Sequence, residues 1–145
     1  MPTVEVCNII NADRGKVFEV IKNMEIFPKF MRDVKTVKVL EYFENRIVTE
    51  WVTNVDGVPI QWIEEDIFND REMSCNFKTL KGDYKYDGVW KVASLKKNKT
   101  RLSILVNFDW QIPNFEKFIG YILEKKARNS LRSMLNAIKK KVENG

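Results

Sequence analysis

The sequence predicts an α+β fold in which a curved, seven-stranded antiparallel sheet wraps around one long C-terminal helix. Three observations lead to this prediction. Residues 34–111 alternate with a period of two and are broken by tight turns, which is typical of an antiparallel meander of six strands. A β-branched segment, residues 3–10, precedes them and supplies a seventh strand. Residues 113–142 carry an apolar stripe at helical spacing, and one face of the sheet is the surface in this chain that can cover it.

Length and composition set the class of protein. A chain of 145 residues fits one domain, residues 1–145, and can bury a core without disulfide or metal support. Nine Phe, four Tyr and four Trp need burial, which excludes disorder. Histidine is absent, which excludes His-based acid–base catalysis, Ser-His-Asp triads and His-ligated zinc. Cys7 and Cys75 are too far apart for a Cys-x-x-Cys motif, so we expect two reduced thiols, no metal and no cofactor.

The first strand and two short helices come from the start of the chain. Alternating β-branched residues predict a strand over 3–10. Asp13 is an N-cap residue type, and the apolar spacing after it predicts a helix over about 13–22. Residues 26–31 predict a second short helix, with Pro28 in its first turn.

Six strands follow, over residues 34–44, 46–55, 58–69, 72–81, 84–96 and 100–111. Asp56-Gly57 is the strongest turn signal, because both residues tolerate the positive φ that a two-residue hairpin requires. Turn-forming residues also separate the other strands, at Asn45, Asn69-Asp70, Gly82-Asp83 and Lys97-Asn98. We expect the strand over 3–10 to pair with the last strand on one side and with the second strand on the other.

One long helix is predicted from Pro113-Asn114 to about Val142. Its apolar residues recur at i, i+3, i+4 and i+7 over about 28 residues, or about 40 Å. They are Phe115, Phe118, Ile119, Ile122, Leu123, Leu131, Met134, Leu135, Ile138 and Val142. The basic run 139–141 closes the helix, where cations complement the helix dipole, so we interpret it as a solvated helix end.

The order of these elements, together with several segments, resembles the START-like superfamily, whose fold is called helix-grip. Residues 9–21, Ile-Ile-Asn-Ala-Asp-Arg-Gly-Lys-Val-Phe-Glu-Val-Ile, resemble its first strand and helix. Residues 25–31, Glu-Ile-Phe-Pro-Lys-Phe-Met, resemble its second helix, and 82–90 with 102–109 resemble its paired late strands. The branch that the chain is most similar to is the polyketide cyclase/dehydrase and coenzyme Q-binding group. Lipid-transfer proteins, aromatase/cyclases, hormone receptors and a bacterial toxin share this fold, so the resemblance does not fix a function.

In that superfamily the sheet and the long helix often enclose an apolar cavity. The resemblance implies that Trp62, Glu64, Asp66 and Phe68, which alternate along one strand, face inward. Large apolar side chains also share single faces of the neighbouring strands. The candidate ligand-binding residues are therefore Trp62, Asp66, Phe68, Phe77, Tyr86, Trp90, Val106 and Phe108. The alternative is that these side chains fill a solid core.

Glu64 and Asp66 are the sharpest chemical feature of the sequence. If both face a cavity, burial raises their pKa, and one could serve as an acid, a base or a hydrogen-bonding group. In the opposite register they face solvent, and in a third interpretation Arg46 or Arg101 neutralises them. Aromatase/cyclases share a cavity Tyr, Arg and Gln, whose positions here align with Val34, Asp66 and Val106. None of the three matches, which favours passive binding.

We therefore expect a protein that binds a hydrophobic small molecule, such as a lipid, an isoprenoid quinone or an aromatic polyketide, in an internal cavity. One alternative is an enzyme, a polyketide aromatase/cyclase or dehydrase that uses Asp66, Glu64 and either Tyr86 or Tyr84.

A second alternative is a module that binds ribosomal RNA or another macromolecule through its basic helix, as the toxin branch implies. The net charge of +5 is spread along the chain, which disfavours a nucleic-acid partner. No signal peptide is visible and no apolar run approaches the roughly 20 residues of a membrane span. We accordingly expect a cytoplasmic protein with no transmembrane segment, and its oligomeric state stays open.

Overall fold

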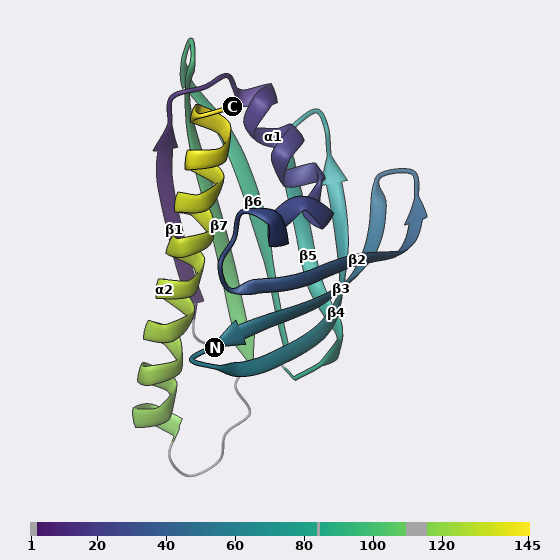
Figure 1. Ribbon diagram of the computed structural model, residues 1–145, viewed down its shortest axis with the longest axis vertical. Helices are drawn as coiled ribbons and strands as arrows, with labels where there is room; N and C mark the ends of the chain where they lie inside the picture. The colour runs from purple at the N-terminus through teal and green to yellow at the C-terminus, as the bar shows by residue number, and fades with distance from the viewer. Residues whose placement is uncertain (1–2, 84, 110–115) are drawn as a thin grey trace.

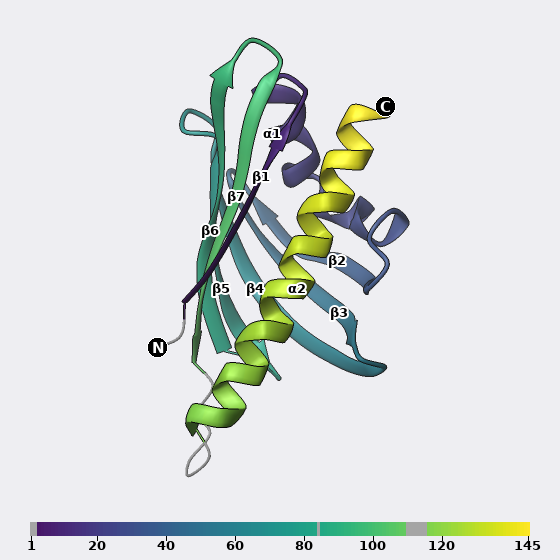
Figure 2. The same ribbon diagram turned by 90° about the vertical axis from the view of Figure 1, so that its left-hand side faces the viewer.

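Seven strands form one antiparallel sheet in the order β1-β7-β6-β5-β4-β3-β2, and a long helix, α2, lies across its concave face (Figures 1 and 2). This computed structural model describes residues 3–83, 85–109 and 116–145, and for 116–121 the backbone alone. The elements are β1 (Thr3–Ile10), α1 (Arg14–Lys22), the 3-10 helix η1 (Met24–Lys29), β2 (Val34–Phe43), β3 (Arg46–Val55), β4 (Val58–Asn69), β5 (Ser74–Gly82), β6 (Lys85–Lys96), β7 (Lys99–Asp109) and α2 (Glu116–Glu143). The predicted α+β helix-grip fold is confirmed.

One predicted pairing is wrong. β1 pairs with β7, with Val4 opposite Val106, as expected. β2, however, pairs with β3 and not with β1, so β1 and β2 are the two edges of the sheet. η1 packs against β2, and α1 packs against α2, β6 and β7. These two short helices therefore cover the end of the concave face that lies beside the C-terminal part of α2, and no β1–β2 ladder closes it (Figure 1).

The second short helix also differs from its prediction. It is the 3-10 helix η1, which begins at Met24, and Pro28 lies near its end rather than in its first turn. In a 3-10 helix side chains three positions apart lie on the same side, and here Met24 and Phe27 are both buried. Phe27 is fully buried and packs edge-on against Phe30 and against Trp51 of β3. Burial of this apolar pair accounts for the shifted start of the helix.

The β3–β4 hairpin turns at Asp56-Gly57, as predicted. Val55 pairs with Val58, and φ is 53° at Asp56 and 82° at Gly57, which is the left-handed backbone of a tight two-residue turn. Lys126 of α2 forms an ion pair with Asp56. The tip of this hairpin is thereby tied to the long helix.

The helix α2 is anchored by its C-terminal half. Leu135, Ile138 and Val142 are buried, whereas Ile122 is 37% exposed. The predicted stripe is confirmed for that half, and its first three members, Phe115, Phe118 and Ile119, lie outside the residues whose side chains are described. No helix in the described ranges combines the length and the apolar character needed to cross a membrane.

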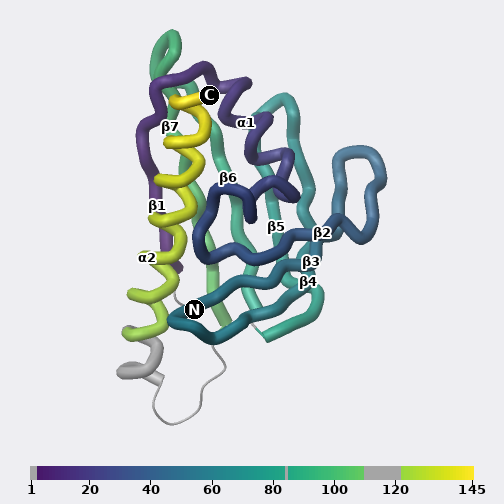
Figure 3. Tube along the Cα trace, in the orientation of Figure 1, coloured from purple at the N-terminus to yellow at the C-terminus, as the bar shows by residue number. Residues whose placement is uncertain are grey.

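α2 also runs beside β1, although the two come from opposite ends of the chain (Figure 3). Two basic side chains of the helix bind the backbone of this edge strand. Arg128 donates a hydrogen bond to the carbonyl of Glu5 at 3.2 Å, and Lys139 donates one to the carbonyl of Ile9 at 2.6 Å. These contacts fix the helix along the outer edge of β1.

Candidate functional site

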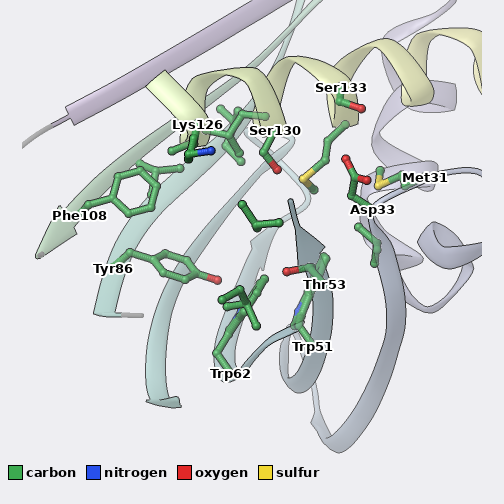
Figure 4. Close-up of a pocket in the computed structure, with 18 of the residues that line it drawn as sticks. Met31, Asp33, Trp51, Thr53, Trp62, Tyr86, Phe108, Lys126, Ser130 and Ser133 are labelled. Atoms are coloured by element: carbon green, nitrogen blue, oxygen red, sulfur yellow. The ribbon is translucent and has the colours of Figure 1, made fainter. Parts of the chain in front are cut away.

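A pocket of about 380 Å³ lies between the concave face of the sheet and α2 (Figure 4). Side chains of six strands, β2 to β7, form one wall, and Leu123, Ala127, Ser130, Leu131 and Met134 of α2 form the opposite wall. Sites for small organic ligands occupy about 300–1,000 Å³ and are mostly apolar. The pocket therefore has the size and the lining of a small-molecule site.

The pairing of β3 with β4 shows how far each residue of the hairpin lies from the mouth of the pocket. The tip of the hairpin, beside Val58, lies at the mouth. Further along, Trp51 of β3 lies opposite Trp62 of β4, and their rings stack at 5.5 Å with 9° between the planes. Thr49 and Glu64 form the next pair on this face. Since a strand rises about 3.4 Å per residue, Glu64 lies about 20 Å along β4 from Val58, at the inner end.

Tyr86 of β6 is the centre of the aromatic floor. Its ring lies 5.9 Å from that of Trp62, 5.7 Å from Phe77 and 6.1 Å from Phe108, measured between ring centroids. The first two pairs are edge-to-face, which is a favoured geometry for aromatic rings. Figure 4 shows Tyr86, Trp62 and Trp51 on the sheet side, facing Ser130 of α2. The floor is thus held in shape by ring contacts before any ligand binds.

Glu64 is the charged group at the inner end of the pocket. Its Oε1 accepts a hydrogen bond from Trp62 Nε1 at 2.8 Å and another from the Tyr86 hydroxyl. The residue is only 4% exposed. Burial raises the pKa of Tyr86 well above its ordinary value, and the charge of Glu64 raises it further. Tyr86 therefore stays a neutral donor to the Glu64 carboxyl group.

Asp66 lies behind Glu64 and is fully buried. Its Oδ2 accepts a hydrogen bond from the Thr49 hydroxyl at 2.7 Å, and Thr49 in turn accepts one from Trp51 Nε1 at 2.8 Å. Oδ1 has no donor among the described residues. Burial raises the pKa of Asp66 well above its ordinary value, and the neighbouring Glu64 charge and its hydrogen bond add to the rise. When Asp66 is protonated at Oδ1, this oxygen gains a partner, because the hydroxyl can donate a hydrogen bond to Glu64.

The raised pKa of Asp66 predicts how stability depends on pH. Below about pH 4 the carboxyl is protonated in both folded and unfolded chains; above it the unfolded chain loses the proton and the folded chain keeps it. Wild-type stability should therefore fall as the pH rises from about 4 until it passes the folded pKa. Asp66→Asn removes this fall, so its stability relative to wild type should increase over that range in urea denaturation at pH 3 to 7.

Glu65→Gln is the matched control, because Glu65 lies on the opposite face of β4 and pairs with Arg46. The stability of Glu65→Gln relative to wild type should not increase between pH 3 and pH 7. An Asp66→Asn protein whose stability tracks wild type at every pH would mean that Asp66 is ionised in the folded state.

The structure places six of the eight predicted ligand-binding residues on the pocket wall: Trp62, Phe77, Tyr86, Trp90, Val106 and Phe108. Asp66 lies behind that wall, and Phe68 packs edge-on against Phe18 of α1 at 6.3 Å. Among the candidate catalytic residues, Glu64 and Tyr86 reach the pocket, whereas Tyr84 lies outside the described residues.

The suggested counter-ion is not found at the carboxyl pair. Arg46 binds Glu65 on the other face of β4 at 2.6 Å, and no ion pair joins Glu64 or Asp66 to a basic residue within the described ranges. The third interpretation of these carboxylates is therefore wrong for Arg46. Their inward register is correct, since both are buried.

The α2 wall is the part of the site that sequence reasoning missed. Ala127 and Ser130 line the pocket from a stretch where the apolar stripe is interrupted, between Leu123 and Leu131. Small residues inside an apolar stripe leave space beside a helix, so this interruption is the sequence signal that could have predicted the α2 wall of the pocket. Val34, aligned by resemblance with a polar cavity position, also lines the pocket.

Charges at the mouth of the pocket occur in pairs. Lys126 of α2 binds Asp56 of the hairpin, and the Arg32 guanidinium lies 3.3 Å from the Asp33 carboxylate. A polar hollow of about 420 Å³ adjoins the mouth, and Asn129 contributes to its lining. The mouth therefore carries little net charge, in contrast to the inner end.

Comparisons with known proteins agree with this architecture. Residues 10–135 match the family described as polyketide cyclase / dehydrase and lipid transport. A comparison with curated protein sequences finds no match.

Solved structures share the fold at low sequence identity. TTHA0849 from Thermus thermophilus superposes with a TM-score of 0.91 at 22% identity, over 99% of this chain and 98% of that one. The Zhui aromatase/cyclase from a Streptomyces species gives 0.91 at 17%, over 99% and 94%. Norcoclaurine synthase from Thalictrum flavum, in complex with dopamine and hydroxybenzaldehyde, gives 0.78 at 12%, over 99% and 87%. At these identities the likeness shows the fold alone.

Proposed function

The chain belongs to the polyketide cyclase/dehydrase and lipid transport family, and from this premise we propose that it binds a hydrophobic small molecule in the pocket beneath α2. The observation that carries the proposal is the pocket of about 380 Å³, which has apolar walls and opens through a polar mouth. Binding is driven by the removal of apolar ligand surface from water, worth about 25 cal/mol per Å². A lipid, an isoprenoid quinone and an aromatic polyketide all have such surface.

The aromatic floor supports a ligand that contains a flat ring. Trp62, Tyr86 and Phe108 present large, rigid side chains, and ring-to-ring contacts add about 0.5–1.5 kcal/mol per pair beyond the area buried. Because these rings already contact one another, little conformational entropy is lost when a ligand arrives. A quinone head or an aromatic polyketide meets this description better than a saturated chain does.

Two measurements on the wild-type protein test the proposal. Native mass spectrometry of freshly purified protein should reveal a co-purified apolar molecule. Titration with N-phenyl-1-naphthylamine, a neutral dye that fluoresces in apolar surroundings, should give one bound dye per chain and quench Trp fluorescence. A folded protein that retains no molecule and binds no dye would contradict the proposal.

Catalysis is the second candidate function, and the position of Glu64 favours it. The carboxyl group lies on the pocket wall, where it could accept a proton, and Tyr86 beside it could donate a hydrogen bond to a developing enolate. The purified protein mixed with a minimal polyketide synthase tests this. A binder leaves the shunt products in their usual ratio, whereas a single cyclised product that disappears with Glu64→Gln would establish an enzyme.

A further inference from the structure

The charge of the pocket differs between its mouth and its inner end. The basic residues on its wall, Arg32 and Lys126, both lie at the mouth and both are paired, with Asp33 and Asp56. At the inner end Glu64 is the charged residue on the described wall. A ligand that reaches this end therefore meets negative charge that no basic side chain of the described wall compensates.

The hydrogen-bond donors described at the inner end are already bonded to Glu64. The N–H of Trp62 and the O–H of Tyr86 are both donated to Oε1 of Glu64, so neither is free for a ligand. Both of these bonds fall on Oε1, and the fully buried Asp66 lies behind Glu64 rather than on the pocket wall. Among the residues that the structure describes, the inner end thus offers a ligand an acceptor and no uncommitted donor.

Aromatic rings line the pocket beside this acceptor, and Trp62 and Tyr86 direct their polar edges at it. The rings of Trp62, Phe77 and Phe108 all lie within 6.1 Å of the Tyr86 ring, and all four line the pocket. A ring face attracts a cation within about 6 Å of its centroid, and the attraction grows when water is excluded. A cation at the inner end would gain first from the charge of Glu64, and a ring face within this distance would add to the attraction, whereas an anion would be repelled by Glu64.

We propose that the ligand carries an ammonium group on its hydrophobic body and that Glu64 binds this group at the inner end of the pocket. The inference rests on the proposed function, because it assigns a ligand class to the same pocket. A primary ammonium is a charged donor, so it can pair with the negative charge of Glu64 and hydrogen-bond to its Oε2. A fatty-acid carboxylate, in contrast, would face Glu64 with no free donor on the described part of the inner wall.

Three probes of equal chain length test the assignment: decylammonium, decanol and decanoate, each displacing N-phenyl-1-naphthylamine at pH 7 and low ionic strength. Decylammonium should bind wild type about tenfold more tightly than decanol, and decanoate more weakly than decanol. Glu64→Gln keeps the shape of the side chain and removes its charge, so it should bring decylammonium to within about twofold of decanol. Asp66→Asn is the matched control and should keep the preference, because Asp66 lies behind the pocket wall and does not reach the ligand.

The outcomes separate this inference from the proposed function. Equal binding of decylammonium and decanol to wild type would overturn the ammonium assignment and leave the apolar site intact. A dye that binds but is displaced by none of the three probes would also overturn the ammonium assignment and leave the apolar site intact, whereas a protein that binds no dye would overturn the proposed function as well. A Glu64→Gln protein that loses affinity for the three probes equally would show that Glu64 only supports the pocket, which also overturns the assignment. The wild-type ranking needs no variant, so a poorly folded Glu64→Gln protein does not prevent the test.

Discussion

Replacing Ala127 by Trp should abolish binding of the apolar dye while leaving the fold intact. Ala127 lies on α2, is half-buried at the margin of the core and borders the pocket. A larger side chain forced into a packed core costs about 1–3 kcal/mol, but here the indole can extend into empty space. The dye affinity should fall by about 100-fold or more, which corresponds to about 2.7 kcal/mol. Dye titration gives the affinity, and urea denaturation shows whether stability is retained.

Ala93→Trp is the control for this experiment. Ala93 is exposed on β6 and is absent from the pocket wall, so its replacement should leave dye binding unchanged. If Ala127→Trp were folded and bound the dye as wild type does, the dye site would have to lie elsewhere on the protein.

Phe27→Ala should cause the largest loss of stability among these variants. The side chain is fully buried and packs edge-on against Trp51 and Phe30, at centroid distances of 5.8 and 5.9 Å. Truncation of a buried Phe costs about 3–5 kcal/mol, because apolar burial is lost and a cavity remains. The free energy of unfolding from urea titration measures the effect. Since Trp51 lines the pocket, dye affinity should also fall.

Phe43→Ala is the matched control, because this Phe is 68% exposed at the end of β2. Its removal should change the free energy of unfolding by less than about 0.5 kcal/mol. A loss below about 1 kcal/mol for Phe27→Ala would mean that η1 contributes little to the core.

The order of the elements could be predicted because its signals are local. Alternation identifies a strand from a few neighbouring residues, and Asp56-Gly57 identifies a turn from two. Which strands become edges depends on contacts between distant segments. The sequence of β1 and β2 contains nothing that reports the packing of η1 on β2, so the expected β1–β2 pairing was wrong.

The sequence predicts which side of β4 contributes to the site, but not which residues of that side reach the pocket. The period of two put Trp62, Glu64, Asp66 and Phe68 on one side of β4, and only the family resemblance implied that this side faces inward, as it does. Curvature of the sheet and the position of α1 then separate them, with Glu64 on the pocket wall and Phe68 against α1.

The link between Glu64 and Tyr86 depends on pairings that alternation does not specify. It spans β5, and the register between β4 and β5 shifts between Ile63 and Glu64. A bulge of this kind has no dependable sequence signal here, so the contact emerges only from the structure.

The open sheet has a consequence for how one molecule meets another. An exposed edge strand carries unpaired backbone groups that can template a strand from a second chain, which leads to aggregation. On β1, Arg128 and Lys139 of α2 already bind the outward carbonyls of Glu5 and Ile9. On β2, two register shifts break the ladder, and the exposed Lys38 adds charge to the edge. Each edge is therefore blocked against intermolecular strand addition, one by side chains that bind its carbonyls and the other by irregular geometry and charge.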